Sequence, residues 1–125
     1  MKAHPRSDAA NRFAERRQRE QDAPRLLDRV PALATLRLDV AAGRNATSSE
    51  PKHSRIIVVD AAPALFVLPC ADHACREGGH DLTSTVLHAL AAGTTHFELE
   101  DTCYGNVGSA SCGRALHVQV TATYR

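Results

Sequence analysis

Four cysteines constrain the fold of this chain most strongly, because they form two pairs in its second half. Cys70 and Cys75 lie in the stretch LPCADHACREGGHDL, and the eight residues YGNVGSAS separate Cys103 from Cys112. The chain begins with basic residues but lacks the apolar core typical of a secretory signal, so we expect a cytoplasmic location. In a reducing compartment, four cysteines are more often metal ligands or free thiols than a disulfide framework.

The length and charge of the chain narrow further the classes of protein and of partner that it fits. A length of 125 residues suits a single domain with a tail. The formal net charge is +1, from 15 basic and 14 acidic residues, so no overall field favours nucleic acid, a membrane or an acidic substrate. No segment approaches the ~20 apolar residues of a membrane-spanning helix. Arginine far outnumbers lysine, a bias typical of high-GC coding that favours a bacterial origin.

Residues 1–31 are predicted to form an N-terminal charged helical arm, and residues 32–125 a separate domain. Residues 8 to 22 are mostly charged or amide side chains, so a helix there has little to bury and should be solvated and mobile. We expect it to bind a protein partner or to self-associate, with Phe13 as the apolar anchor. Its mixed charges disfavour nucleic acid. Asp22 and Pro24 resemble the start of a second helix that ends near Pro31.

The next segments change from helical to strand periodicity. Residues 34 to 41 alternate between apolar and polar side chains, which predicts a half-buried strand. Residues 43 to 54 are polar and read as a loop. Residues 55 to 60 and 64 to 69 are apolar enough for two buried strands. Pro63 lies between them and cannot donate to a ladder, so the segment is either one bulged strand or a turn between two strands.

The rest of the chain predicts a helix followed by two strands. Asp81 can cap a helix that carries Leu82, Val86 and Leu90 on one stripe and ends at Gly93. Residues 96 to 101 and 115 to 124 alternate again. The expected fold is therefore α+β, a mostly antiparallel sheet of four to five strands with one crossover helix on its inward face.

This order of elements brings the four cysteines together. The strand through residue 66 ends at Cys70, the helix carries the chain away by roughly 16 Å, and the next strand returns it to Cys103. The last strand begins after Cys112 and runs in the opposite direction. All four thiols are thus expected at one end of the sheet. Zinc favours four soft or borderline ligands in a tetrahedron, often as two pairs from short loops, so the expected cofactor is Zn²⁺.

At this point the chain resembles zinc-ribbon and zinc-knuckle proteins, which also hold two cysteine pairs at the ends of β-structure. The resemblance covers about residues 65 to 118 and lacks the CxxC knuckles typical of those families. It implies Cys70, Cys75, Cys103 and Cys112 as the metal ligands. It names no activity.

Other readings of the same residues remain open. The cysteines can be free thiols, or a redox sensor that releases zinc and forms disulfides on oxidation. His73 or His80 can replace a cysteine as ligand, which would allow a small metal-dependent enzyme, but solvated loop histidines are commoner. His96 and His117 are expected as plain surface residues. Because no catalytic motif is present and four thiolates complete a tetrahedron, we predict a non-enzymatic interaction module with a structural zinc site.

Overall fold

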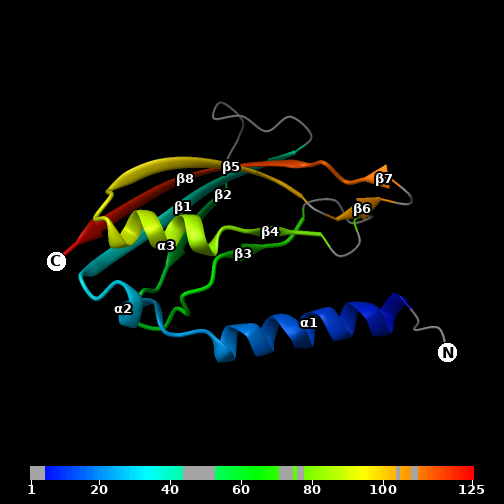
Figure 1. Cartoon of the computed structure of the whole chain (residues 1–125), viewed down its shortest axis with the longest axis horizontal. Helices are drawn as coiled ribbons and strands as arrows, with labels where there is room; N and C mark the ends of the chain where they lie inside the picture. The colour runs from blue at the N-terminus through cyan, green and yellow to red at the C-terminus, as the bar shows by residue number, and fades with distance from the viewer. Residues whose placement is uncertain (1–4, 44–52, 71–74, 76–77, 104, 108–109) are drawn as a thin grey trace.

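The computed structural model describes residues 5–43, 53–70, 75, 78–103, 105–107 and 110–125, and it shows the expected α+β fold (Figure 1). The helices are α1 (Pro5–Asp22), α2 (Leu26–Arg29) and α3 (Thr83–Ala91). The strands are β1 (Leu33–Gly43), β2 (His53–Ile57), β3 (Val67–Leu68), β4 (His80–Asp81), β5 (His96–Thr102), β6 (Asn106–Val107), β7 (Ala110–Ser111) and β8 (Ala115–Tyr124). No helix among the described residues is long and apolar enough to cross a membrane.

The main sheet has four strands in the order β2-β1-β8-β5, and every neighbouring pair is antiparallel. Its longest strands, β1 and β8, pair along almost their whole length, from Leu33 opposite Tyr124 to Gly43 opposite Ala115. Both strands carry the alternating pattern, which puts every second apolar side chain on one face. The three strands predicted from alternation are therefore confirmed.

The hydrophobic core lies between the inner face of this sheet and α3 (Figure 1). Val86 and Leu90 of α3 are buried against a cluster that includes Val118 and Val120 of β8. The helix ends at Ala91, and Gly93, the predicted terminator, follows two residues later with a φ of 77° that favours a residue without a Cβ. Leu82 and not Asp81 holds the cap position and makes no side-chain cap hydrogen bond, whereas the Asp81 carboxylate, one residue earlier, accepts the backbone N–H of Thr83 at 3.1 Å.

Two short ladders lie outside the main sheet, β3 with β4 and β6 with β7. The strand expected over residues 64 to 69 is reduced to two residues, and it pairs with β4 instead of joining the main sheet. Of the two alternatives for the segment around Pro63, one bulged strand or a turn between two strands, the structure has the turn. The backbone N–H groups of Ala61 and Ala62 both donate to the carbonyl of Val58, after which the chain leaves the sheet. Pro63 itself forms an isolated bridge with Arg25.

The strand expected at residues 55 to 60 is displaced and largely exposed. Observed β2 spans His53–Ile57 at an edge of the sheet, and Ile56 is 78 % exposed. An edge strand has a neighbour on only one side, so a continuous apolar run there does not imply burial. Residues 53 and 54 belong to this strand, whereas the rest of the predicted loop, residues 44 to 52, lies outside the described residues.

The first two helices follow the expected order but meet differently. Asp22 ends α1 and does not cap α2, which has Arg25 at its cap position and no side-chain cap hydrogen bond. The described side chains of α1 after residue 13 are almost all exposed, as expected for a solvated helix. An ion pair joins α1 to the rest of the chain, with Arg19 Nη2 3.1 Å from Asp81 Oδ2.

Candidate metal centre

The four cysteines stand on four separate segments that meet at one end of the molecule. Cys70 follows β3, Cys75 precedes β4, Cys103 follows β5, and Cys112 follows β7. Figure 1 shows β6 and β7 at this end and the C-terminus at the opposite end. Backbone hydrogen bonds continue the β5–β8 pairing into the centre, from Cys103 N to the Arg114 carbonyl and from Cys112 N to the Gly105 carbonyl, both at 2.8 Å.

The predicted convergence of the thiols is confirmed by their sulfur positions. All four Sγ atoms lie within 4.8 Å of one another. The closest pairs are Cys70 with Cys112 and Cys75 with Cys103, each 3.6 Å apart. Four sulfurs at the usual Zn–S distance of about 2.3 Å in a tetrahedron lie about 3.8 Å apart, whereas a disulfide needs about 2.0 Å. The spacing therefore suits a shared metal ion, and none of the four cysteines forms a disulfide.

Three glycines form the backbone wall of the centre. A Cβ atom at Gly78 would collide with Cys75 Sγ and lie 2.6 Å from Cys103 Sγ, so no larger residue fits beside the sulfurs. The backbone N–H of Gly105 donates to Cys103 Sγ at 3.4 Å, and that of Gly79 donates to the same sulfur. Glycine lacks a Cβ and therefore permits this close approach of backbone to sulfur, which no sequence motif predicted.

The surroundings of Cys75 and Cys103 affect their thiols in opposite directions. Burial alone would raise the pKa of Cys103, but the N–H groups of Gly105 and Gly79, with the neighbouring thiols, lower it below its ordinary value. For Cys75, burial and then hydrogen bonds with the other three cysteines raise the pKa far above its ordinary value. Because metals bind the thiolate form, Cys103 is better prepared than Cys75 to bind a metal ion first.

His80 does not belong to the sulfur cluster, and it is not a solvated loop residue either. It lies in β4 and is 2 % exposed, and its Nδ1 lies 2.7 Å from Asp101 Oδ2 on β5. This pairing was not predicted, because the two residues are 21 positions apart and neither belongs to a motif. His73, with the neighbouring Asp72 and Glu77, lies outside the described residues.

The two histidines expected on the outer face of the sheet differ in burial. His96 is exposed as predicted, but His117 is only 3 % exposed. His117 lies on β8, an inner strand whose two neighbours flank it with side chains. Its Nε2 lies 3.5 Å from Glu98 Oε2, and its buried Nδ1 has no hydrogen-bond partner among the described residues. The pKa of Glu98 is lowered mainly by a hydrogen bond from Gln119 and to a smaller extent by His117.

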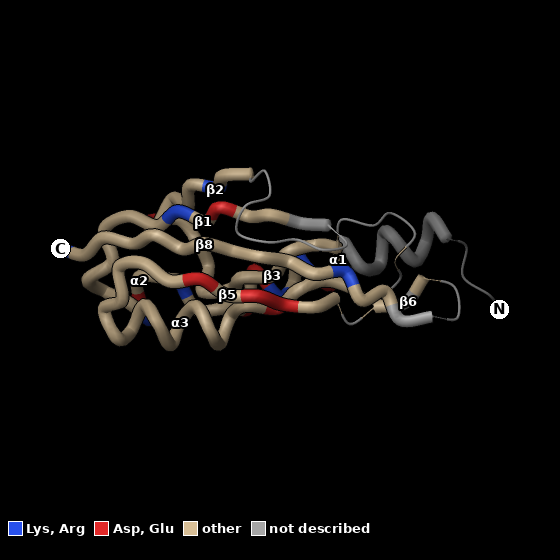
Figure 2. The backbone as a smooth tube through the Cα atoms, turned by 90° about the horizontal axis from the view of Figure 1, so that it is seen from above, with Lys and Arg blue, Asp and Glu red and all other residues tan. Residues whose placement is uncertain are grey.

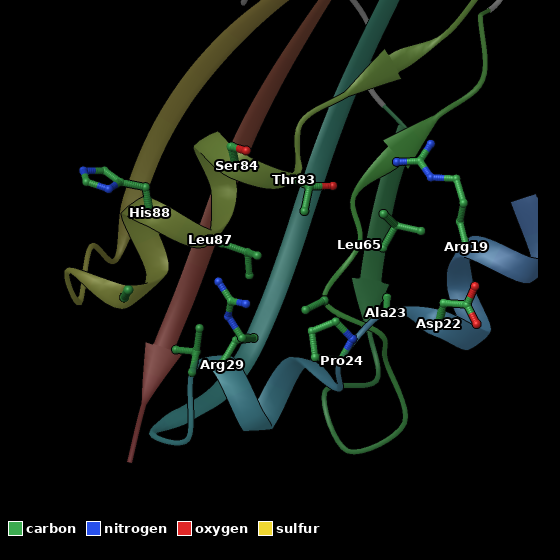
Figure 3. A pocket seen from close by; sticks show the side chains of 13 residues that line it. Arg19, Asp22, Ala23, Pro24, Arg29, Leu65, Thr83, Ser84, Leu87 and His88 are labelled. Carbon is green, nitrogen blue, oxygen red and sulfur yellow. The ribbon is translucent and has the colours of Figure 1, made fainter.

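A cleft of about 810 Å³ lies away from the cysteines, between the end of α1, α2 and α3 (Figure 3). Arg19 and Asp22 of α1 line one side, and Leu87 of α3 lines the other. Its lining contains no cysteine. Among the described residues, the candidate functional site is therefore the cluster of four thiols and not this cleft.

Fold and site together define a small α+β protein with a four-cysteine cluster that could hold a metal ion. Cys70, Cys75, Cys103 and Cys112 could each offer one sulfur ligand, which would fill a tetrahedral site and leave no position for a substrate. No protein-family model, curated protein or solved structure matches this chain. Any function must therefore be argued from the cluster itself.

Proposed function

We propose that Cys70, Cys75, Cys103 and Cys112 bind one Zn²⁺ ion as a closed structural site, which makes the chain a non-enzymatic, zinc-stabilised interaction module. The observation that carries this proposal is the approach of all four Sγ atoms to within 4.8 Å of one another. Zinc takes four thiolates in a tetrahedron and gains nothing from redox change, which suits a structural role. The donor set consists of sulfur alone, and soft thiolates select zinc over the oxygen-binding cations.

The distribution of the hydrophobic core supports a structural role for the ion. The buried cluster and the apolar residues packed on it extend from Leu26 to Tyr124, but they include no described residue from 69 to 81 or from 100 to 115. The four segments at this end are therefore held by strand pairing, by the His80–Asp101 pair and by the sulfur cluster, outside the apolar cluster. A metal bound by all four would supply the missing stabilisation, because binding free energy becomes folding free energy.

Metal analysis of untagged protein tests this proposal directly. Native mass spectrometry should find one Zn²⁺ per chain, and replacement of zinc by Co²⁺ should give the absorption of a tetrahedral thiolate complex. Each Cys→Ser variant at the four positions should lose the ion or weaken its binding strongly. Thr102→Ser, an exposed neighbour of Cys103, is the matched control and should keep full occupancy. Equal zinc content in all four cysteine variants would contradict the proposal.

The paired sulfur distances favour a thiol redox sensor as the second candidate. The two closest pairs, Cys70 with Cys112 and Cys75 with Cys103, are the pairs that oxidation would join. One molecule of peroxide would take two electrons from one pair of thiolates, which forms one S–S bond, and the peroxide is reduced to water. Oxidation of both pairs removes the four thiolate ligands and releases Zn²⁺. Reversible zinc release by stoichiometric peroxide would favour this function. Zinc that stays bound would favour the purely structural role.

The interaction surface belongs, in this proposal, to α1. Its described side chains are polar and largely exposed, and they include Glu15, Arg17, Arg19 and Glu20. Mixed charges at helical spacing suit a protein partner better than a phosphate backbone, and the exposed acidic residues of β5 also disfavour nucleic acid. Limited proteolysis of the zinc-loaded monomer tests this role. Trypsin should cut within α1 before it cuts the sheet, and a resistant α1 would show a helix docked on its own domain.

A further inference from the structure

The two edges of the main sheet differ sharply in the side chains they expose. On the edge strand β5, Glu98 and Glu100 are exposed, and Figure 2 shows acidic residues along this strand. At the other edge, Ile56 of β2 is 78 % exposed and Val58, just beyond it, is 68 % exposed. Charged side chains protect an edge from pairing with another chain, whereas exposed apolar ones invite it. The β2 edge carries one charged side chain, Arg55, beside its exposed apolar ones, so it is less protected than the β5 edge.

The two exposed apolar side chains lie on the same face of the sheet. Side chains alternate along a strand, so Ile56 and Val58 project to the outer face. Ile57 and Val59 project inward, where Val59 is buried in the core and Ile57 packs against it. Among the described residues, β2 pairs with β1 alone. As far as the described part of the chain goes, its other side offers backbone N–H and C=O groups to a further strand.

We propose that β2 of one copy of this chain pairs antiparallel with β2 of a second copy, about a two-fold axis at Ile57. In this register, Ile56 lies opposite Val58 of the partner subunit, and Val58 lies opposite Ile56 of the partner subunit. Each exposed apolar side chain is thereby covered by the other, in two equivalent pairs. Such reciprocal contacts are what a two-fold interface requires. The two sheets would join into one continuous sheet with no β2 edge left open.

The charges along this segment favour the same arrangement. Residues 53 to 60 carry one cation, Arg55, and one anion, Asp60, if His53 is neutral. Both side chains are exposed. Antiparallel pairing about Ile57 brings one cation and one anion from each copy to the contact, so no net charge opposes it. Pairing of β2 with β5 of another copy would instead set the apolar side chains beside Glu98 and Glu100, and it would not close on itself.

Sedimentation of the full-length, zinc-loaded protein over a range of concentrations tests the proposal. The wild-type chain should show a monomer–dimer equilibrium. Ile56→Asp and Val58→Asp should each weaken dimerisation about tenfold or more, because each places a carboxylate in both of the equivalent cross-strand pairs. Thr121→Asp is the matched control. Thr121 is exposed on the outer face of the inner strand β8 and lies opposite Arg37, so the added carboxylate leaves the edge untouched.

A double variant tests the register. Ile56→Asp combined with Val58→Lys places opposite charges across the axis only if the axis passes through Ile57, so dimerisation should return toward the wild-type level. An axis at Ile56 or Val58 would place like charges opposite each other and keep the double variant monomeric. Amide hydrogen exchange should show protection of residues 54 to 58 in the dimer. A wild-type monomer at all concentrations, a dimer unaffected by both single variants, or a double variant that stays monomeric would overturn the proposal.

Discussion

The imidazole of His80 is hydrogen-bonded to the carboxylate of Asp101, with Nδ1 and Oδ2 2.7 Å apart. Their strands carry the chain into the cysteine centre from two directions, since β4 follows Cys75 and β5 leads directly to Cys103. His80 is almost fully buried. The pair therefore holds together two of the four segments that supply sulfur, although neither residue is a member of the sulfur cluster.

Replacing His80 should consequently weaken metal binding without removing a ligand. His80→Ala leaves a cavity and an unpaired Asp101 carboxylate, so we expect a loss of about 1–3 kcal/mol in unfolding free energy. We also expect a lower zinc affinity, measured by competition with a chelator, at unchanged stoichiometry. His88→Ala, at an exposed position of α3, should change neither. Zinc stoichiometry below one in His80→Ala would instead indicate that this histidine is a ligand.

Gly78 should tolerate no side chain in the metal-bound protein. A methyl group there would lie within 2.6 Å of the sulfurs of Cys75 and Cys103, so Gly78→Ala must push the two sulfurs apart. We expect a strong loss of zinc affinity and a Co²⁺ spectrum that no longer indicates a regular tetrahedron. Gly113→Ala is the control variant, because it tests the backbone conformation of a glycine without a steric clash. Its φ is also positive, at 63°, but its Cβ would meet no atom within 4 Å, so it should cost about 1 kcal/mol and keep the metal.

Asp81 should make stability depend on pH in the acidic range. Partial burial would raise its pKa, but hydrogen bonds from Thr83 and Arg19 outweigh this effect and lower it. Since the folded pKa lies below the unfolded value of about 3.9, the carboxylate stabilises the fold above that pH. The contribution is lost as the pH falls through the folded pKa.

Comparison of the wild type with Asp81→Asn by urea unfolding measures this effect. The difference in unfolding free energy should be constant above about pH 5 and should shrink below about pH 4. It should stay below about 1 kcal/mol, because the ion pair with Arg19 is half exposed. Protonation of the thiols affects both proteins alike and cancels in the difference. A gap that widens toward low pH would contradict this assignment.

Metal removal should loosen one end of the protein and spare the other. The core beneath α3 does not include the described residues around the sulfurs, so chelation should leave β1, β8 and α3 folded. We expect amide exchange to accelerate at residues 78 to 81, 103, 105 to 107 and 110 to 112 after chelation and to stay slow in the middle of β8. Uniform loss of protection across the whole chain would show that the sheet itself needs the metal.

Local periodicity was enough to predict the strands through Leu36, Phe97 and Val118 and the helix that carries Val86. Each has an apolar pattern whose period is set by backbone geometry, which does not depend on the rest of the fold. The approach of the four cysteines also followed from the sequence, because a strand, a helix and a returning strand bring loop ends to one side of a sheet. These features need only the order and the length of the elements.

Only the tertiary structure decided which neighbours each element has. An apolar run reads alike at the edge and in the middle of a sheet, so the sequence could not tell that Ile56 would be exposed. His117 alternates outward like His96, yet its place on the inner strand β8 buries it. The His80–Asp101 pair and the fit of Gly78 between two sulfurs join residues distant in sequence. Burial and contact depend on what packs from elsewhere in the chain, and the period of a single segment carries no information about that.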